Sequence, residues 1–313
     1  RFLDLAHVTS GGRTEEQKKS LKMKTTLCKA GFSESIFYSF FSPKDLDMIR
    51  LPEDAPERVA IRLMNPLTED LSLMRTALVP SMINCAVRNL RRGNTEGRFF
   101  ELARVFRPKA LPLTEYPEER DMLSIMAFGD QETFFTVKSA PEVIAESFGV
   151  KFTYEKATRP YYHPGMTAAI FCEGKEIGVM GRVSYEICEE LAVEKPIFIV
   201  ELDYALLSEM LDRKLRYTPI SKFAVEKRDL ALVVDEEMTC GELSQAIESG
   251  CKYLTEVSLF DVYRSEAIGE GKKSMAFSLV FTPTDHEFAS DEIDKYVQKI
   301  LKKLSFMYGI ELR

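Results

Sequence analysis

The sequence lacks long apolar runs and has only three histidines, and each of these shortages excludes a class of protein. No run approaches the roughly 18 consecutive apolar residues of a membrane-spanning helix, so we expect no membrane partner. No charged-then-apolar signal pattern opens the chain, and we expect a cytoplasmic protein. The histidines (His7, His163, His286) lie far apart and the six cysteines form no C-x-x-C pair, so neither a metal site nor a disulfide framework is predicted.

Excess positive charge is also missing. The chain has 42 Lys plus Arg against 49 Asp plus Glu, a net charge of -7. Residues 220–313 contribute 12 cations and 17 anions, a net of -5. Affinity for nucleic acid comes largely from clustered cations on phosphates, so any RNA contact must be local. Residues 86–110 are the exception, with seven cations against two anions; a solvated helix end is the simplest explanation, and a subunit contact or RNA phosphates are the alternatives.

What is present indicates two α+β domains. A chain of 313 residues that is 45% hydrophobic can bury two cores. Helix and strand patterns are mixed across the first part, which predicts a mostly antiparallel sheet with helices on its face over residues 1–212. The charged stretch 213–219 contains Pro219 and is the predicted linker. Because the chain begins at Arg1 without a periodic pattern, we expect it to be part of something longer.

Helix starts and apolar periodicity locate the elements of the first domain. We predict helices near residues 14–31, 80–93, 141–148, 184–191 and 204–211, and strands near residues 32–41, 98–106, 123–128, 168–172, 176–180 and 197–202.

Residues 220–313 carry the clearest pattern. A strand at 229–234, a helix opening at Thr239, strands at 254–263 and 274–281, a helix opening at Ser290 and a closing strand at 310–312 follow in order. The order is βαββαβ, a ferredoxin-like fold. In such a fold one helical layer covers one sheet face and leaves the other open, and an open sheet face is a frequent binding platform.

The second strand of this module holds the residues most suited to binding. Strict alternation gives Val257, Leu259, Asp261 and Tyr263 one face and Ser258, Phe260 and Val262 the other, and the sequence does not decide which face is open. Tyr263 is the candidate to stack on an unpaired base, a contact that contributes about 1–3 kcal/mol. A half-buried strand tyrosine is the alternative. Arg264, Lys272 and Lys273 on the hairpin are candidates for phosphate contacts, or else solvated loop charges.

Three strings of this module resemble a known family in order and spacing. KRDLALVV at residues 227–234, LFDVYR at 259–264 and GKKSMAF at 271–277 resemble the terminal domain of the bacterial phenylalanyl-tRNA synthetase beta subunit. Upstream strings resemble the catalytic-like region of the same subunit: GGRT at 11–14, FYSF at 37–40, NPLTE at 65–69, MRT at 74–76, FELARVF at 100–106 and HPG at 163–165. In that family, tRNA-binding, editing and DNA-binding-like modules precede these regions.

The resemblance implies a class II synthetase-like, non-catalytic core domain over residues 1–212 and an anticodon-binding domain over residues 220–313. It implies an alpha subunit and phenylalanine tRNA as partners in a heterotetramer. That complex attaches phenylalanine to tRNA with ATP and magnesium, and no cofactor is expected in this part. The implied tRNA-binding residues are Tyr263, Asp261, Arg264, Arg228, Lys272 and Lys273.

Departures from active class II motifs predict that this chain alone does not catalyse. Arg98 and Glu101 stand at R-x-x-E spacing instead of R-x-E, and GVMGR at residues 178–182 is too sparse in glycine for the later motif. The alternative function is an amino-acid-sensing regulatory module, because such domains use the same βαββαβ order and topology alone does not separate the two.

Overall fold

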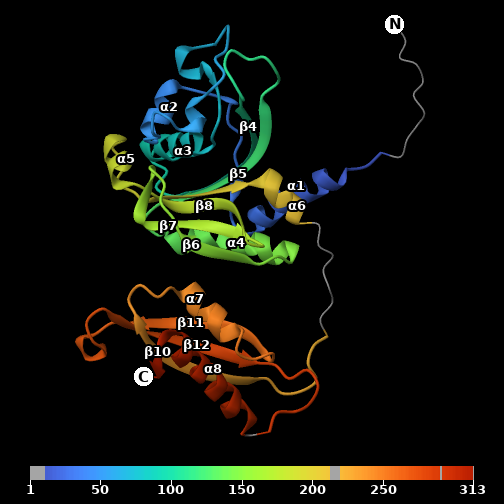
Figure 1. Cartoon of the computed structure of the whole chain (residues 1–313). Coiled ribbons are helices and arrows are strands. Elements are labelled where there is room, and N and C mark those ends of the chain that lie inside the picture. The colour runs from blue at the N-terminus through green and yellow to red at the C-terminus, as the bar shows by residue number, and fades with distance from the viewer. Residues whose placement is uncertain (1–10, 212–218, 290, 313) are drawn as a thin grey trace. The chain divides into compact units, whose positions relative to one another are not determined.

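The computed structural model describes residues 11–211, 219–289 and 291–312, and it divides the chain into two compact units, Arg1–Leu215 and Arg216–Arg313 (Figure 1). The predicted linker at 213–219 lies outside the described residues except for Pro219, so its role stays a prediction.

The first unit begins with helix α1 (Glu15–Lys29), which the sequence predicted. Its start is fixed by reciprocal hydrogen bonds: the Gln17 amide donates to the Thr14 hydroxyl at 3.2 Å, and the Thr14 amide donates to the Gln17 side chain at 3.0 Å. Met23 and Leu27 are fully buried, which docks the helix on the sheet.

A seven-stranded sheet organises this unit in the order β1-β4-β5-β9-β8-β7-β6. Only the β1–β4 pair is parallel, so the predicted mostly antiparallel sheet is confirmed. The strands are β1 (Ser33–Glu34), β4 (Gly97–Arg107), β5 (Glu118–Phe128), β6 (Phe152–Lys156), β7 (Tyr162–Cys172), β8 (Lys175–Val183) and β9 (Ile197–Asp203).

The predicted strand over residues 32–41 is wrong in its middle. Only β1 and β2 (Phe40–Phe41) are strands, and β2 pairs with β3 (Leu73–Met74) in a separate small sheet. Between them the chain leaves the large sheet because the Phe37 amide donates to the Glu101 carboxylate, 3.0 Å away, instead of to a neighbouring strand. A side chain distant in the sequence therefore decides this segment.

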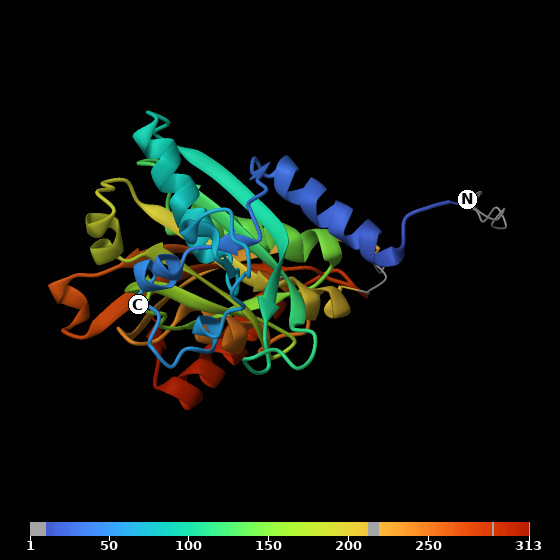
Figure 2. The same ribbon diagram turned by 90° about the horizontal axis from the view of Figure 1, so that it is seen from above.

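Helices cover both faces of the sheet, whereas the sequence predicted a single face. Leu123 and Ile125 of β5 pack with α1, α4 (Phe134–Phe148) and α6 (Tyr204–Met210). Met126 and Phe128 pack with α3 (Val79–Arg91) and α5 (Tyr185–Glu190). Seen from above, β4 runs between α1 and α3 (Figure 2). The cause is that β5 is apolar at successive positions, so both its faces need a partner layer.

Helix α4 begins seven residues earlier than predicted, at Phe134, and holds Pro141 in its interior. Thr133 caps it, and Val137, Ala140 and Ile144 bury one helical face against the sheet. Burial of that face outweighs the hydrogen bond that a proline removes. The remaining short elements of this unit are α2 (Pro43–Met48), η1 (Pro56–Arg58) and η2 (Glu69–Leu71).

The second unit confirms the βαββαβ order. Its four-stranded sheet has the order β11-β12-β10-β13, and both helices pack on one face of it. The elements are β10 (Glu226–Asp235), α7 (Cys240–Glu248), β11 (Leu254–Tyr263), η3 (Glu266–Ile268), β12 (Lys272–Phe281), α8 (Glu292–Tyr308) and β13 (Glu311–Leu312). Within the described ranges, none of the chain's helices combines the length and hydrophobicity needed to cross a bilayer.

The core of the second unit uses alternate strand positions. Leu230 and Leu232 of β10 and Phe277 and Leu279 of β12 are buried against α7 and α8. The positions between them, such as Ala231 and Ala276, are half-buried, and no helix of the described part of this unit lies on their face. The predicted open face therefore exists and is lined by small side chains.

Candidate nucleic-acid interface

A β-bulge decides which residues of β11 reach the open face. Leu259 pairs with Phe277 and Asp261 pairs with Ala276, so Phe260 is an extra residue in β11. Directly paired residues of two strands point to the same face. Leu259 thus faces the helices with Phe277, while Asp261 faces the open side with Ala276.

The predicted face assignment for β11 is wrong for this reason. Strict alternation grouped Val257 and Leu259 with Asp261 and Tyr263, but the extra residue reverses the alternation after Leu259. Val257 and Leu259 pack against the core. Tyr263 pairs with Ser274 and shares the open face with Asp261.

The resulting surface is aromatic and acidic. The side chain of Tyr263 is 44% exposed and that of Phe260 59% exposed, and Asp261 is exposed as well. The cross-strand neighbours Ser274 and Ala276 are small, and opposite Cβ atoms in a pair lie only about 4.5–5.5 Å apart. Ser274 is almost fully buried, so a flat group such as a base would meet the exposed part of the tyrosine ring.

Two of the predicted phosphate-binding cations are engaged within the protein. The Arg264 guanidinium forms a fork on the Glu236 carboxylate, with contacts at 2.7 and 3.1 Å. The Lys273 ammonium donates to the Glu236 backbone carbonyl at 2.7 Å. Hydrogen bonding from Arg264 lowers the pKa of Glu236, so the pair stays ionised. Lys272 is exposed, and its ammonium group forms no hydrogen bond or ion pair with any of the described residues.

Arg228 does not join these residues. It lies on the helix-covered side of the sheet, paired with Leu279 in β12. Its guanidinium contacts Glu226 at 3.1 Å and Asp294 of α8 at 3.8 Å. The structure therefore brings Asp261 and Tyr263 together on one face and leaves Arg228 on the other.

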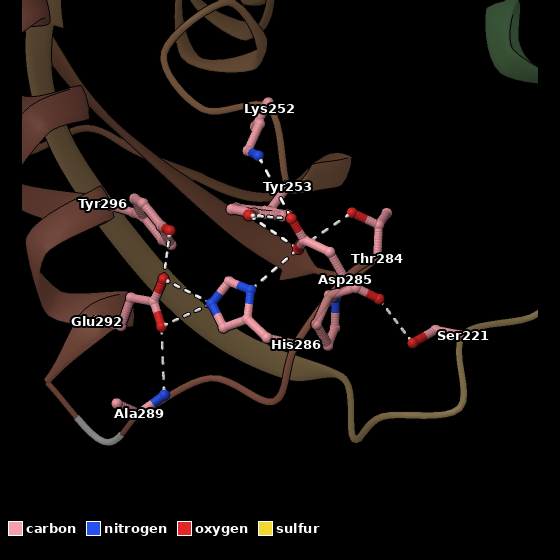
Figure 3. Close-up of polar contacts among 10 residues, drawn as sticks. Ser221, Lys252, Tyr253, Thr284, Asp285, His286, Ala289, Glu292 and Tyr296 are labelled. Carbon is pink, nitrogen blue, oxygen red and sulfur yellow. Dashed lines mark hydrogen bonds and ion pairs between the residues drawn. The ribbon is translucent and has the colours of Figure 1, made fainter.

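A polar network that sequence reasoning missed lies at the opposite end of β12 from Tyr263 (Figure 3). His286 bridges two carboxylates: Nδ1 lies 3.0 Å from Asp285 and Nε2 lies 3.1 Å from Glu292. Tyr253 and Tyr296 donate to the same two carboxylates. Hydrogen bonding to Glu292, then to Asp285, raises the pKa of His286.

The adjacency of Asp285 and His286, with Glu292 opening the next helix, was the available signal for this network. The network ties the loop after β12 to α8 and to the start of β11. Across the described ranges, no cluster of three or more His, Cys, Asp or Glu side chains is arranged to hold a metal ion.

In the first unit, the residues that resemble catalytic motifs are engaged in structural contacts. Arg98 forms an ion pair with Glu132 at 2.8 Å. Glu101 pairs with Arg75 at 3.0 Å, and both side chains are almost fully buried. Gly178 permits close strand packing, because a Cβ there would lie 2.0 Å from the Glu201 carbonyl oxygen. Arg104 and Lys109 also pair with carboxylates, so the basic run at residues 86–110 is partly neutralised.

Comparison with protein families covers nearly the whole chain. Residues 3–204 match the model described as the phenylalanyl tRNA synthetase beta chain CLM domain. Residues 221–313 match the ferredoxin-fold anticodon binding domain.

Individual relatives agree with these matches. The chain is 33% identical over 305 residues to the phenylalanine–tRNA ligase beta subunit of Clostridium acetobutylicum, covering 96% of this chain and 38% of the relative. It is 34% identical over 319 residues to that of Halalkalibacterium halodurans, covering 97% of this chain and 39% of the relative. The chain thus spans about two fifths of the curated relatives that it matches.

Among solved structures, the pyrrolysyl-tRNA synthetase of Desulfitobacterium hafniense is similar. Its TM-score is 0.50 at 16% identity, over 66% of this chain and 75% of the other. At this identity the likeness concerns the fold, and it agrees with the predicted class II synthetase-like fold of the first unit.

Proposed function

This chain belongs to the phenylalanyl-tRNA synthetase beta chain family, and on that premise we propose that it is a non-catalytic part of a phenylalanine–tRNA ligase. In this proposal the first unit packs on an alpha subunit and the second contacts the anticodon region of phenylalanine tRNA. The assembled cytoplasmic ligase joins phenylalanine to that tRNA with ATP and magnesium. The rest of the complex uses the ATP and magnesium.

The observation that carries the RNA contact is the meeting of Asp261 and Tyr263 on a sheet face that none of the described helices covers. Bases of a single-stranded loop can unstack and lie on an aromatic ring, and a carboxylate can accept hydrogen bonds from a base edge. The tyrosine then supplies affinity and the aspartate supplies selectivity for bases with donor groups.

Charge supports the same mode of binding. The second unit is acidic, and Arg264 and Lys273 are already engaged with Glu236. Binding through stacking releases few counterions, so we expect a shallow dependence of affinity on salt. Of the three hairpin cations, Lys272 is the one left to contact a phosphate. Lys272→Ala should therefore slightly reduce the salt dependence of tRNA affinity.

The test is a titration of phenylalanine tRNA with the assembled ligase that carries this chain. Tyr263→Ala should weaken binding about 5- to 150-fold, the equivalent of about 1–3 kcal/mol of stacking, and Tyr263→Phe should retain most of the affinity. Tyr308→Ala, which removes an exposed tyrosine from α8, is the matched control. Equal affinity of the Tyr263→Ala and Tyr308→Ala variants would contradict the RNA contact.

For the alpha-subunit contact, support comes from apolar side chains exposed near the small sheet. Ile36 is 86% exposed, Met64 96% and Leu67 85%, and Tyr38 is 69% exposed. Their segments are joined by the β2–β3 pairing and by the hydrogen bond from the Leu63 amide to Ser72. Exposed apolar patches of this kind mark protein interfaces.

Co-purification with the alpha subunit tests this contact. Ile36→Asp combined with Met64→Asp should abolish retention of the chain on an immobilised alpha subunit. Phe135→Asp, which charges an exposed apolar residue on the opposite side of the sheet, should leave retention intact. Loss of retention with Phe135→Asp but not with the double variant would reject the proposed patch.

We propose that this chain alone does not catalyse, because the residues at its catalytic-motif positions form ion pairs within the protein. Because Arg98 is paired with Glu132, a nucleotide phosphate would have to compete with this carboxylate for the guanidinium. Aminoacylation by this chain in the absence of the alpha subunit would refute this part of the proposal.

A further inference from the structure

A partly enclosed pocket lies in the first unit, between the sheet and the layer formed by α2 and α3. Its volume is about 50 Å³, room for roughly three to five waters at about 10–15 Å³ each. Ile49, Leu78 and Met122 form an apolar wall. The pocket is therefore large enough for a few non-hydrogen atoms and has a surface that suits an alkyl group.

The opposite wall carries ionisable groups, of which Glu201 is the most enclosed. One oxygen of its carboxyl group accepts hydrogen bonds from the Tyr161 hydroxyl at 2.8 Å and the Tyr162 hydroxyl at 3.5 Å. The residue is surrounded by protein yet keeps partial exposure, and it lines the pocket. Its second carboxyl oxygen has no hydrogen-bond partner in the part of the chain that the structure describes.

Two further charged residues line the pocket, Glu57 and Arg107. Neither forms an ion pair within the described ranges, although both are half-buried. Most other half-buried charges of this unit are paired, as Arg120 is with Asp203 and Arg159 with Glu176. The wall thus holds two carboxyl groups against one guanidinium, and a half-buried charge without a partner is costly unless a ligand meets it.

We propose that this pocket binds a small aliphatic molecule carrying a protonated primary amine, with the ammonium group held by Glu201, Tyr161 and Glu57. An ammonium group has three donors, which the free oxygen of Glu201, the hydroxyl oxygen of Tyr161 and the Glu57 carboxylate can accept. The alkyl part lies on the apolar wall. Arg107 can receive a carboxylate, so small amino acids belong to the same ligand class.

The raised pKa of Glu201 makes the binding of a cation at this site depend on pH. Burial raises the pKa of Glu201 to about 7, and the nearby Glu57 charge raises it further, whereas the hydrogen bonds from Tyr161 and Tyr162 and the Arg159 charge lower it. Arg107 also lines the space. Because a cation binds the ionised form, affinity for an amine should be about tenfold higher at pH 8 than at pH 6.

Calorimetric titration of the whole chain tests the site with three probes: propylamine, alanine and propionate. We expect propylamine and alanine to bind at millimolar concentrations and propionate not to bind. Glu201→Gln should weaken propylamine binding at least tenfold, and Arg107→Met should weaken alanine but not propylamine. Glu155→Gln, the same change on the exposed edge strand β6, is the matched control.

Several results would overturn the proposal. Binding of propionate as tight as that of propylamine would reject a cation site, as would no heat from either amine. If Glu201→Gln does not fold, as judged by circular dichroism, Glu57→Gln replaces it, and unchanged propylamine affinity in that variant rejects the site. The pocket lies wholly in the first unit, so these results are separate from those on tRNA binding.

Discussion

At the scale of single residues, the buried pair Arg75–Glu101 explains how the segment before β2 is held. Besides the ion pair, Arg75 donates to the Arg104 backbone carbonyl at 2.8 Å, and Glu101 accepts from the Phe37 amide at 3.0 Å. One pair thus joins β4 to two segments that are distant in the sequence. Its charges are satisfied by several hydrogen bonds, the condition under which a buried pair is tolerated.

We predict that Arg75→Met lowers the free energy of unfolding of the first unit by about 3–5 kcal/mol, because Glu101 would stay buried without its counter-charge. Urea denaturation checks this. The double variant Arg75→Met with Glu101→Leu should recover a large part of the loss, since it removes both charges. A single variant as stable as the parent chain would contradict the role assigned to the pair.

His286 should make the stability of the second unit depend on pH. Its pKa is raised above the ordinary value of 6.5, so the folded state binds the proton more tightly, and this stabilisation is complete below 6.5 and lost as pH rises through the raised pKa. The pKa values of Asp285 and Glu292 are lowered, so their contribution is present above their ordinary values of 3.8 and 4.5 and is lost in acid.

The stability difference between the parent chain and His286→Asn should therefore be largest between pH 4.5 and 6.5 and should shrink as the pH rises above 6.5. Thermal unfolding at a series of pH values measures it. His163→Asn, a change to a histidine of the first unit, serves as control. A difference that grows with pH would have the wrong sign for a histidine held by two carboxylates.

At the scale of elements, the bulge in β11 determines the composition of the candidate interface. With Phe260 as the extra residue, Leu259 faces the core and Asp261 faces the open side. If Phe260 instead took a regular position in the ladder, strict alternation would turn Asp261 and Tyr263 toward the helices. A single inserted residue therefore separates a core-forming half of the strand from a binding half.

Deletion of Phe260 should leave Asp261 and Tyr263 on the open face, because Asp261 would then follow Leu259 directly and keep its pairing with Ala276 in a regular strand. Phe260→Ala is the matched control, because it keeps the bulge and removes only the ring. We therefore expect similar tRNA affinity in the deletion and the alanine variant. Amide hydrogen exchange of β11 reports the strand pairing and a tRNA titration reports the affinity. Loss of tRNA binding in the deletion but not in Phe260→Ala would contradict this assignment of the two faces.

At the scale of the molecule, the two units have separate cores. The core of the second unit consists of residues from β10 onward, including the fully buried Phe277. Among the described residues, the cores of the first unit include none after Leu211. Separate cores favour separate unfolding transitions, since stability comes mainly from buried apolar area.

Phe277→Ala should lower the melting temperature of one calorimetric transition and leave the other unchanged, at a cost of about 3–5 kcal/mol. Phe128→Ala, which removes a fully buried ring from the first unit, should affect the other transition. A shift of both transitions by either substitution would mean that the units unfold together.

Sequence patterns predicted most of the elements because their causes are local. The capping residues Thr14 and Thr239 start their helices by bonding backbone amides three residues on. Apolar periodicity located both cores, and the βαββαβ order followed from the sequence of elements alone. The family was identified from short strings, and the comparisons bear out the family.

The sequence by itself thus determined the fold class and the family, whereas the candidate site depended on pairing between strands. The bulge at Phe260, the engagement of Arg264 and Lys273 by Glu236, and the position of Arg228 on the helix side all arise from register. The pocket beside Glu201 likewise gathers side chains from β4, β5, β9 and the α2–α3 region. Contacts between residues distant along the chain exist only after folding, and local propensity does not encode them.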